Sequence, residues 1–306
     1  PPKEAMPIPS ASRLKKKGSL ANAKPFLKWA GGKWKLMPQL EKSLPQSFKN
    51  YYEPFMGSAA FFFWMKAHNK IPKNSIVTLM DLNEELVICF KEVQGPRYKR
   101  LIRLLKQHEK KHLAANNQGA TGKSHYYYSV RDTLPDDKTE RAARFIYLNR
   151  TCFNGLWREN SRGLFNAPHG RYANPAIVMR DRLQAAGRAL ADAHLVQTDF
   201  RGWPELAQTH GLDFVYLDPP YHPVSPTSSF NAYSGGQFQA QAQRDLAEVC
   251  ARLDRQGVRW LMSNSDCGFV RETWGRWHIR TVRCPRAVNS RADRRGDVSE
   301  VAITNY

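Results

Sequence analysis

The chain has 306 residues, 42% of them hydrophobic, and a formal net charge of +20 from 47 Lys and Arg against 27 Asp and Glu. Such a chain can bury the core of one large domain or two smaller ones, and its charge favours a polyanionic partner, although a solvated basic surface would also explain it. No apolar run approaches the roughly 18 residues that cross a bilayer, and no signal peptide is recognisable, so we expect no membrane association.

The beginning of the chain is polar and basic. Residues 1–24 mix Pro, Ser, Ala and Lys without a periodic apolar face, and we interpret them as a disordered basic tail. The next block places Trp29 and Lys33 around a glycine pair at 31–32. Glycines permit close backbone approach, so the flanking ring and ammonium could hold an aromatic group and an anion. A glycine turn before an ordinary helix over residues 36–40 is the alternative.

Two predicted strand ends follow, and each carries an acid. A strand ends near Glu53, and a turn of small residues then leads into an apolar helix. This order is typical of the first βα turn of a nucleotide-binding fold, where small residues let a ligand lie against the main chain. The apolar run 76–80 ends in Asp81, the position at which such folds hold a ribose hydroxyl pair. Alternatively, Asp81 caps the helix that begins near Glu84.

The character of the sequence changes between residues 95 and 177. This segment lacks strong strand signals and is rich in basic, aromatic and amide side chains. A helix is predicted over residues 140–148, with its apolar residues on one face and Arg141 and Arg144 turned elsewhere. The stretch 149–172 combines Arg and Asn, which read guanine and adenine edges, with Phe, which can wedge into a base stack. A hairpin in its second half would present them, whereas an exposed loop of solvated arginines is the alternative.

An α/β pattern resumes after residue 177. The predicted elements are helices over residues 180–192 and 239–253 and strands over residues 195–200, 214–217, 259–263, 277–284 and 300–306. Helix and strand periods alternate as in a parallel sheet, and the last two strands alternate like a closing antiparallel pair. The first of these strands ends in Asp199 and Phe200. A basic loop over residues 286–296 is suited to phosphate contact.

The run Asp218-Pro219-Pro220-Tyr221 directly follows the apolar strand 214–217. Proline cannot donate to a sheet ladder, so the strand stops and leaves an acid at its carboxyl end, where open α/β sheets bind ligands. If the Asp218 carboxylate and the carbonyl between the prolines accept both N–H hydrogens of a base amine, its lone pair localises and can attack an electrophilic methyl. Tyr221 offers a face on which that base can stack. The alternative is that this run only ends the strand and begins a turn, without a functional role.

Taken in order, the glycine-lysine block, the turn from Glu53 to Gly57, the basic segment and the Asp218 run resemble one family. It comprises the DNA adenine N6-methyltransferases of the Dam type, which use S-adenosylmethionine, and the resemblance covers residues 26–306. It implies an α/β fold: a Rossmann-like class I methyltransferase sheet with helices on both faces, plus an inserted, mostly helical DNA-recognition domain carrying a β-hairpin. The S-adenosylmethionine-binding catalytic domain would comprise residues 25–94 and 178–306, and the DNA target-recognition domain residues 95–177.

The resemblance also assigns catalytic and cofactor roles to matching positions. The implied cofactor contacts are Trp29, Lys33, Phe55, Gly57, Ser58, Asp81, Asp199, Phe200 and Asp218. Asp218 would be the main catalytic residue, with Pro219 and Pro220 helping to hold the target amine and Tyr221 stacking on the base. Among the cofactor positions, one departs from the family pattern, since Ala59 stands where the family usually has a second glycine. In the basic segment, Cys152 and Trp157 also differ from the residues that the family pattern implies.

A second group of matching positions concerns DNA. The implied DNA contacts are Lys28, Arg150, Phe153, Asn154, Leu156, Arg158, Asn160, Pro168 and Arg171. Phe153 would enter the duplex, with Asn154 near the position that the flipped base vacates. Arg158 is among those that stand where the family reads the inner bases of GATC, and Lys28 matches a contact to the outer guanine.

The expected activity is therefore N6 methylation of a flipped adenine in double-stranded DNA, within GATC. The alternatives are another DNA sequence in a restriction-modification system, methylation of RNA or of a glutamine amide on a protein, and a DNA-binding regulator that keeps only the fold. The long basic insert argues for duplex DNA, and the intact Asp218 and Lys33 argue against a regulator.

The cysteines bear on compartment and metal binding. They are Cys89, Cys152, Cys250, Cys267 and Cys284. An odd number without C-x-x-C spacing indicates reduced thiols, neither a metal site nor a disulfide framework. We therefore expect a cytoplasmic protein without a metal site. As separate expectations, the protein associates with DNA and is a monomer in solution.

Overall fold

The computed structural model describes residues 20–29, 33, 34, 36–115, 119–202, 211, 213–222, 240–285 and 297–306. Three sequence-based expectations lie outside them: the tail up to residue 19, the glycine pair at 31–32 and the basic loop 286–296. Residues 20–24, which we had placed in the tail, are ordered. They include the short 3-10 helix η1 (Leu20–Asn22) and the fully buried Ala23, and η1 packs against two helices of the fold, so the ordered chain begins before residue 25.

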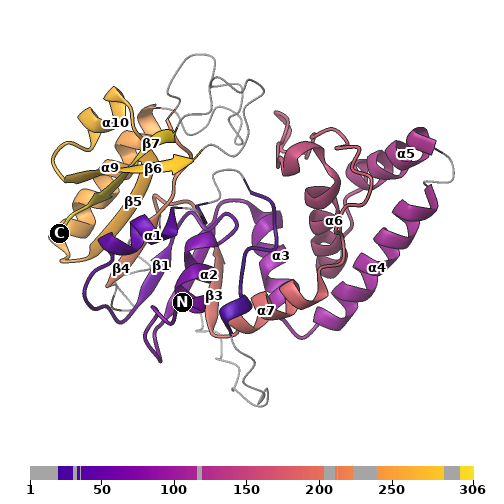
Figure 1. The fold of residues 1–306 in the computed structure, drawn as a ribbon, viewed down its shortest axis with the longest axis horizontal. Coiled ribbons are helices and arrows are strands. Elements are labelled where there is room, and N and C mark those ends of the chain that lie inside the picture. Colours follow the sequence, from indigo (N-terminus) through magenta and orange to yellow (C-terminus); the bar gives the residue numbers. More distant parts are fainter. Residues whose placement is uncertain are drawn as a thin grey trace, which may run out of the picture.

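Among the described residues, seven strands form one sheet in the order β3-β2-β1-β4-β5-β7-β6 (Figure 1). They are β1 (Tyr51–Glu53), β2 (Val77–Asp81), β3 (Ala193–Gln197), β4 (Phe214–Leu217), β5 (Arg259–Ser265), β6 (His278–Pro285) and β7 (Asp297–Thr304). The first five are parallel, and β7 lies antiparallel between β5 and β6, which confirms the predicted closing pair. This is the expected Rossmann-like class I methyltransferase sheet, with its topological switch point between β1 and β4.

Helices cover both faces of the sheet, as expected. The alternation along β4 shows this: Phe214 and Tyr216 belong to one hydrophobic core, Val215 and Leu217 to the other. The helices are α2 (Ala60–Ala67), α3 (Glu84–Gln94) and α7 (Arg180–Leu190) on the first face, and α9 (Ala240–Arg255) and α10 (Gly268–Thr273) on the second. Because both faces are buried, a central strand reads as a continuous apolar run.

Besides η1, two short helices precede β1, namely α1 (Met37–Leu40) and η2 (Glu41–Ser43). Between α3 and α7 the chain forms α4 (Tyr98–Ala114), α5 (Gly119–Asp132) and α6 (Lys138–Thr151), which extend away from the sheet on the right of Figure 1. Helix α6 packs against α3, α4 and α5, and its apolar side chains join the core that α3 covers. The described part of this segment is thus mostly helical and adds no strand to the sheet.

One prediction for α6 is wrong. Arg144, which we expected to turn away from the packed face, is only 6% exposed. Its guanidinium donates to the carbonyl of Val130 at 2.9 Å and to that of Arg131 at 2.5 Å. These carbonyls lie in the last turn of α5, so the buried arginine satisfies groups that a helix end leaves unpaired. The 3.6-residue period of α6 cannot reveal a second helix packed on its polar side.

The predicted hairpin after α6 is present only as a chain reversal. The short 3-10 helix η4 (Phe153–Gly155) is followed by two isolated antiparallel bridges, Cys152 with His169 and Glu159 with Phe165. Aromatic packing supports the reversal, because the Trp157 ring lies 4.4 Å from that of Phe165 and 4.0 Å from a ring of α6. Backbone hydrogen bonds also join the two arms, from the Asn166 N–H to the Arg158 carbonyl at 2.8 Å and from the Asn160 N–H to the Leu164 carbonyl at 2.9 Å. The segment is therefore a hairpin-like reversal without a continuous strand.

Among the described helices, none is long and apolar enough to span a bilayer.

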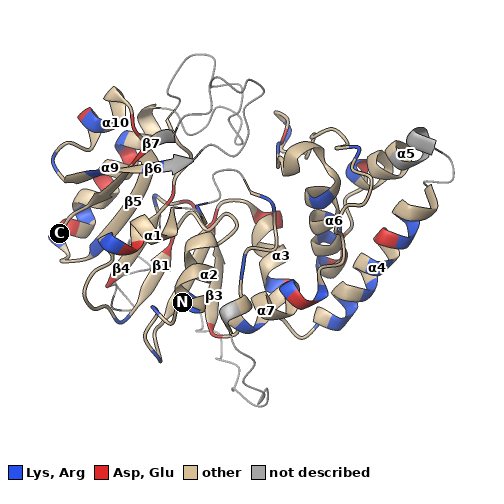
Figure 2. Ribbon diagram, viewed as in Figure 1, with Lys and Arg blue, Asp and Glu red and all other residues tan. Residues whose placement is uncertain are grey.

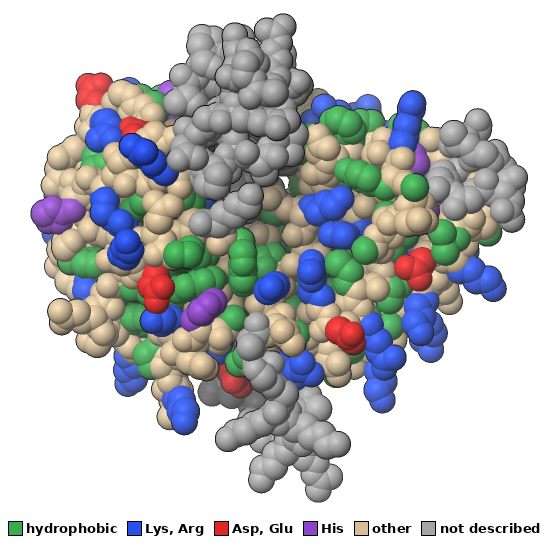
Figure 3. All heavy atoms as spheres, viewed as in Figure 1, with side chains coloured by type: hydrophobic (Ala, Val, Ile, Leu, Met, Phe, Trp, Pro, Cys, Tyr) green, Lys and Arg blue, Asp and Glu red, His purple; other side chains and the backbone are tan. Residues whose placement is uncertain are grey.

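Lys and Arg side chains are frequent over α4, α6 and α7 (Figure 2), and the space-filling view shows them in the middle and at the right of the same face (Figure 3). The thiols of Cys89, Cys152, Cys250 and Cys267 are free. In the space-filling view, further Lys and Arg side chains lie on the left, over the sheet side of the molecule (Figure 3).

Candidate active site

Three acids stand at the carboxyl ends of neighbouring strands. Glu53 closes β1, Asp81 closes β2 and Asp218 directly follows β4. Because β2, β1 and β4 are adjacent and parallel, these acids meet at one edge of the sheet, beside its switch point. The strand β4 ends before Asp218 because the two prolines that follow cannot extend a ladder.

Asp218 has one oxygen held by the protein and one free to accept from a ligand. Its Oδ1 accepts a hydrogen bond from the Ser263 hydroxyl at 2.9 Å and lies 3.5 Å from the Lys33 ammonium. Its Oδ2 has no hydrogen-bond partner among the described residues. Burial raises the pKa of the Asp218 carboxyl, and the Lys33 charge and the Ser263 hydrogen bond oppose that rise.

The two prolines lie in an irregular segment whose backbone is held by two buried side-chain amides. The carbonyl of the exposed Pro220 accepts a hydrogen bond from Nε2 of Gln243 at 3.1 Å, and Gln243 in turn accepts one from Asn264 at 3.0 Å. Both amides are fully buried. Within the described part of the chain, the carbonyl of the buried Pro219 has no hydrogen-bond partner, so it is a second free acceptor beside Asp218.

A salt-bridge cluster adjoins the segment that contains the two prolines. Lys33 is 4% exposed, and its Nζ lies 4.0 Å from the centroid of the Tyr221 ring and 3.8 Å from Oε2 of Glu300. The Tyr221 hydroxyl donates to the same Glu300 oxygen at 2.7 Å. Burial raises the pKa of the Tyr221 hydroxyl, so it remains a donor. The structure thus brings Lys33, Asp218 and Tyr221 together, as the sequence predicted, and adds Glu300 from β7.

Glu53, at the end of β1, lies near this cluster without a cation of its own. Its side chain is 2% exposed and accepts the Tyr51 hydroxyl at 2.6 Å. Burial raises the pKa of Glu53 to about 8; the Tyr51 hydrogen bond opposes that rise, whereas the charge of Asp218 adds to it. Glu53 is therefore largely protonated at neutral pH, and Asp218, beside Lys33, is the carboxyl favoured to carry charge.

The turn after β1 is built around Gly57. Its φ of +48° suits glycine, and a Cβ there would lie 2.9 Å from two indole atoms of Trp29. Its N–H donates to Asp81 Oδ2 at 2.9 Å, and the N–H of Asn83 donates to Asp81 Oδ1 at 3.0 Å. Burial raises the pKa of Asp81, and these hydrogen bonds oppose the rise. Trp29, Gly57 and Asp81 therefore form one cradle.

The alternative assignment of Asp81 as a helix cap is wrong. Asn83 caps α3, because its side-chain oxygen accepts the N–H of Leu86 at 2.9 Å. Asp81 instead joins the turn to the strand end. Ala59, which replaces a family glycine, has a left-handed φ of 52° at the start of α2.

The remaining predicted cofactor positions lie beside this cradle. The rings of Phe55 and Phe200 are 5.4 Å apart. Phe200 is 6% exposed, and Ser58 is 7% exposed next to the turn glycine. Asp199 accepts the N–H of Arg201 at 2.8 Å and pairs with its guanidinium, which lies 4.5 Å from the Phe200 ring.

The N-terminal block is joined to the basic segment by a buried amide. Asn149, the last but two residue of α6, accepts the Lys28 N–H at 2.8 Å and donates to its carbonyl at 2.7 Å. The Lys28 ammonium lies 4.2 Å from the centroid of the Tyr172 ring. Burial lowers the pKa of Lys28, and nearby Arg150 lowers it further. Lys28 is therefore held at one end of the basic segment.

The predicted DNA-reading residues lie along this segment, mostly at the surface. The exposed ones are Phe153, Asn154, Arg158, Pro168 and Arg171, and the partly exposed ones are Arg150, Leu156 and Asn160. Arg158 is held by Asn166, whose side-chain oxygen and carbonyl accept at 2.7 and 3.1 Å. Asn160 has a supporting role, because its side-chain oxygen accepts two backbone N–H groups of its own turn.

One contact links this segment to the cradle of Trp29, Gly57 and Asp81. Oε1 of Glu159 accepts the Trp157 indole N–H at 2.7 Å and the Asn83 side-chain N–H at 3.3 Å. Asn83 also binds Asp81 through its backbone N–H. The segment that follows α6 therefore contacts the end of β2 through two polar side chains.

Sequence reasoning missed several residues of this site: Glu159, Asn166, Gln243, Ser263 and Glu300. Only Ser263 gave a usable signal, because it opens a polar triplet at the carboxyl end of an apolar strand, and fully buried polar residues at a ligand-binding edge require a partner. Gln243, Glu300 and the Glu159 contact with Asn83 act on residues far away in the chain, which a local window does not contain. Asn166 lies eight residues from Arg158, but no motif indicated that pairing.

Comparison with known proteins agrees with this geometry. The sequence model of the D12 class N6 adenine-specific DNA methyltransferases matches residues 29–284. The chain is 36% identical to the Type II methyltransferase M.MjaIII of Methanocaldococcus jannaschii, over 92% of this chain and 99% of that protein. It is 32% identical to the Type II methyltransferase M1.LlaDCHI of Lactococcus lactis (93% and 96%) and 31% identical to the DNA adenine methylase of Escherichia coli K12 (90% and 93%). The chain belongs to the D12 class of N6 adenine-specific DNA methyltransferases.

Proposed function

We propose that this DNA methyltransferase transfers a methyl group from S-adenosylmethionine to N6 of an adenine flipped out of duplex DNA, within the sequence GATC. The observation that carries the proposal is a pair of acceptors at the end of β4 that no described residue occupies, Asp218 Oδ2 and the Pro219 carbonyl, beside the Tyr221 ring. An exocyclic amine has two N–H hydrogens, so two fixed acceptors match it. An adenine in a duplex reaches them only when it leaves the stack.

The chemistry follows from holding that amine. When Asp218 and Pro219 accept both hydrogens, the N6 lone pair is drawn out of conjugation with the ring and becomes nucleophilic. S-adenosylmethionine supplies an electrophilic methyl, whose bond to nitrogen forms as its bond to sulfur breaks. N6 then releases a proton, which Asp218 Oδ2 can take because in this arrangement it already accepts an N6 hydrogen. Most of the rate gain comes from positioning, which the buried amides under Pro220 support.

The cradle fits the cofactor in shape and charge. Asp81 has lone pairs left for a ribose hydroxyl pair, and the Phe55 and Phe200 rings offer faces for an adenine. Because Gly57 has no side chain, which would collide with Trp29, a ligand can approach the backbone at this position. Lys33 lies 3.5 Å from Asp218 and favours its charged form, and that negative charge would attract a sulfonium.

Residues 95–177 are proposed as the DNA target-recognition domain. Arg158 is exposed and fixed by Asn166, which suits a bidentate contact with a guanine. Phe153 is 50% exposed at the start of the reversal, where it can enter the duplex. The basic side chains around α6 would neutralise phosphates and offset the cost of flipping the base (Figure 2).

The first test uses labelled S-adenosylmethionine and three duplexes. One contains GATC, one has the four bases scrambled, and one carries N6-methyladenine at both GATC adenines. Label on the first duplex alone is the expected result. Equal label on the first two would refute GATC recognition, and label on none would refute the reaction. Asp218→Ala should abolish transfer while most DNA affinity remains, and turnover by that variant would contradict the catalytic role.

A second test addresses specificity at single positions. Arg158→Ala should weaken discrimination at one base pair of GATC by about tenfold or more, since a bidentate contact contributes about 1–3 kcal/mol. Arg162→Ala is the matched control, because Arg162 is exposed on the same turn without a predicted base contact. Relative rates on duplexes with each base pair changed in turn measure both. Equal relaxation by the two variants would argue against direct reading by Arg158.

A further inference from the structure

Glu300 is a largely buried carboxylate in the site, and neither the motifs nor the proposed reaction gives it a role. Its Oε2 accepts the Tyr221 hydroxyl at 2.7 Å and lies 3.8 Å from the Lys33 ammonium. Its side chain is 14% exposed. Burying a carboxylate costs free energy unless it is paired, and these two partners account for its place in the fold.

The strand β7 gives Glu300 a rigid base. Glu300 pairs with Ser265 of β5 and with Val282 of β6, so a strand flanks it on each side. Tyr221, in contrast, lies beyond the end of β4 and belongs to no helix or strand of the described chain. The hydroxyl-to-carboxylate bond therefore fixes the far end of the ring to the sheet, while the hydrogen bond to the Pro220 carbonyl fixes the backbone next to it.

We propose that Glu300 is a positioning residue for adenine methylation: by holding the Tyr221 hydroxyl, it sets the plane in which the flipped base stacks beside Asp218. The role rests on the proposed function, because it requires the base to stack on Tyr221. Stacking by itself tolerates many ring orientations, whereas transfer requires N6 to meet two fixed acceptors. Loss of Glu300 should therefore slow transfer more than it weakens DNA binding.

Three substitutions separate the possible routes. Glu300→Ala removes both the acceptor and the charge. Glu300→Gln keeps a side-chain oxygen for the hydroxyl but removes the charge that faces Lys33. Tyr221→Phe keeps the ring and removes only the hydroxyl. If the hydrogen bond positions the ring, Glu300→Gln should retain most activity, and Tyr221→Phe should lose as much as Glu300→Ala.

The expected size follows from one hydrogen bond to a charged group. Glu300→Ala and Tyr221→Phe should each lower the single-turnover rate constant on a GATC duplex about 10- to 100-fold. The double variant should be no slower than Glu300→Ala alone, because both changes remove the same contact. Dissociation constants for DNA and for S-adenosylmethionine should change less than threefold. Glu272→Ala, an exposed glutamate on α10, is the matched control and should keep the wild-type rate.

A second readout reports the stacking itself. A duplex with 2-aminopurine at the target adenine should gain emission when the base leaves the stack, and Tyr221 should partly quench it. Glu300→Ala should be brighter than wild type, Glu300→Gln should resemble wild type, and thermal unfolding should show that each variant is folded. A wild-type rate in Glu300→Ala, or equally slow Gln and Ala variants, would overturn the proposal. Failure of the proposed function is distinguishable, since the wild-type chain itself would then leave the GATC duplex unlabelled.

Discussion

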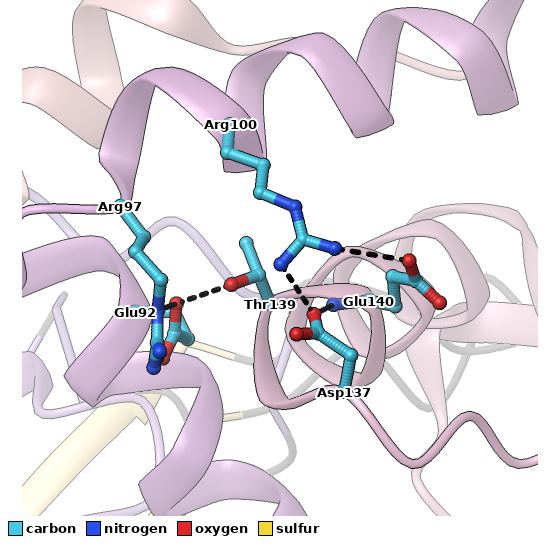
Figure 4. Close-up of polar contacts among 6 residues, drawn as sticks. All are labelled: Glu92, Arg97, Arg100, Asp137, Thr139 and Glu140. Carbon is cyan, nitrogen blue, oxygen red and sulfur yellow. Dashed lines mark hydrogen bonds and ion pairs between the residues drawn. The ribbon is translucent and has the colours of Figure 1, made fainter.

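Replacing Glu92 by alanine should destabilise the junction at which α4 and α6 meet α3. The polar contacts there are made by Glu92, Arg97, Arg100, Asp137, Thr139 and Glu140 (Figure 4). Glu92 is 4% exposed and accepts hydrogen bonds from the Thr139 hydroxyl at 2.9 Å and from Arg97 Nε at 3.0 Å. Thr139 is fully buried, so its hydroxyl has no route to water when the carboxylate is gone.

The magnitude follows from those contacts. A hydrogen bond to a charged group contributes about 1.5–3 kcal/mol, and a buried hydroxyl left without a partner costs about 1–3 kcal/mol. Because the two effects overlap, Glu92→Ala should lower the free energy of unfolding by about 3 kcal/mol. Thr139→Val leaves Glu92 paired with Arg97 and should cost about 1 kcal/mol. The double variant has no orphaned hydroxyl, so its loss should fall short of the summed losses by about 1 kcal/mol.

Urea unfolding of the four proteins, followed by tryptophan fluorescence, measures this cycle. Arg100→Ala is the matched control, because Arg100 joins the same junction through Asp137 at 2.7 Å and Glu140 at 3.1 Å. The three side chains are 34%, 39% and 45% exposed, and exposed pairs contribute little, so the control should unfold near the wild-type midpoint. Additive losses in the cycle, or a control as unstable as Glu92→Ala, would refute the reasoning.

Three further substitutions test the sheet edge. Burial raises the pKa of Glu53 from 4.5 to about 8, so the folded chain keeps a proton that the unfolded chain releases, and the free energy of unfolding should fall as pH rises through that window. Glu53→Gln should flatten this slope in urea unfolding, and parallel curves would count against the pKa. Asn83→Ser keeps an oxygen that can cap α3 but loses the N–H that Glu159 accepts, so the melting temperature should not change. Titration calorimetry should show that cofactor binding strengthens DNA binding less than in the wild type. Wild-type coupling in this variant would exclude the Asn83–Glu159 contact as the link. Ala59→Gly removes left-handed backbone strain, which stabilises the fold by about 1–2 kcal/mol. The same change loses the burial of a methyl group, about 0.8 kcal/mol, and raises the conformational entropy of the unfolded chain, which costs about 0.4–1 kcal/mol. Thermal unfolding should therefore change little, and a large gain would mean that strain dominates.

Much of the sheet could be predicted because its signals are local. The strand β4 ends at Leu217, just before the two prolines, as their missing N–H groups predict. The alternation of apolar and polar residues in the last two strands predicts their antiparallel pairing. Strand ends also carry the acids, so the order of Glu53, Asp81 and Asp218 along the chain already places them at one edge of a parallel sheet. Backbone chemistry and period suffice for such features.

The predictions from sequence that failed concern residues whose environment is set by a second helix, strand or loop packed against them. Arg144 lies on the polar side of α6 by period, but α5 packs there and its last carbonyls need donors. Asp81 precedes a helix as a cap would, yet Asn83 is two residues closer and takes that role. In the chain reversal after α6, only isolated bridges form where we predicted a hairpin, and the Trp157 ring packs on that of Phe165 between the two arms. Tertiary contacts override local preference in each case.

The catalytic run near residue 218 therefore depends on both ends of the chain. Lys33 comes from the segment before α1 and Glu300 from the last strand, and they meet only because β7 inserts between β5 and β6. That antiparallel insertion places a carboxylate on the Tyr221 hydroxyl, 79 residues away in sequence. The motif supplies the acceptors and the ring, but the sheet order sets the ring's plane. The strand order of the fold is thus itself part of the positioning on which the proposed methyl transfer relies.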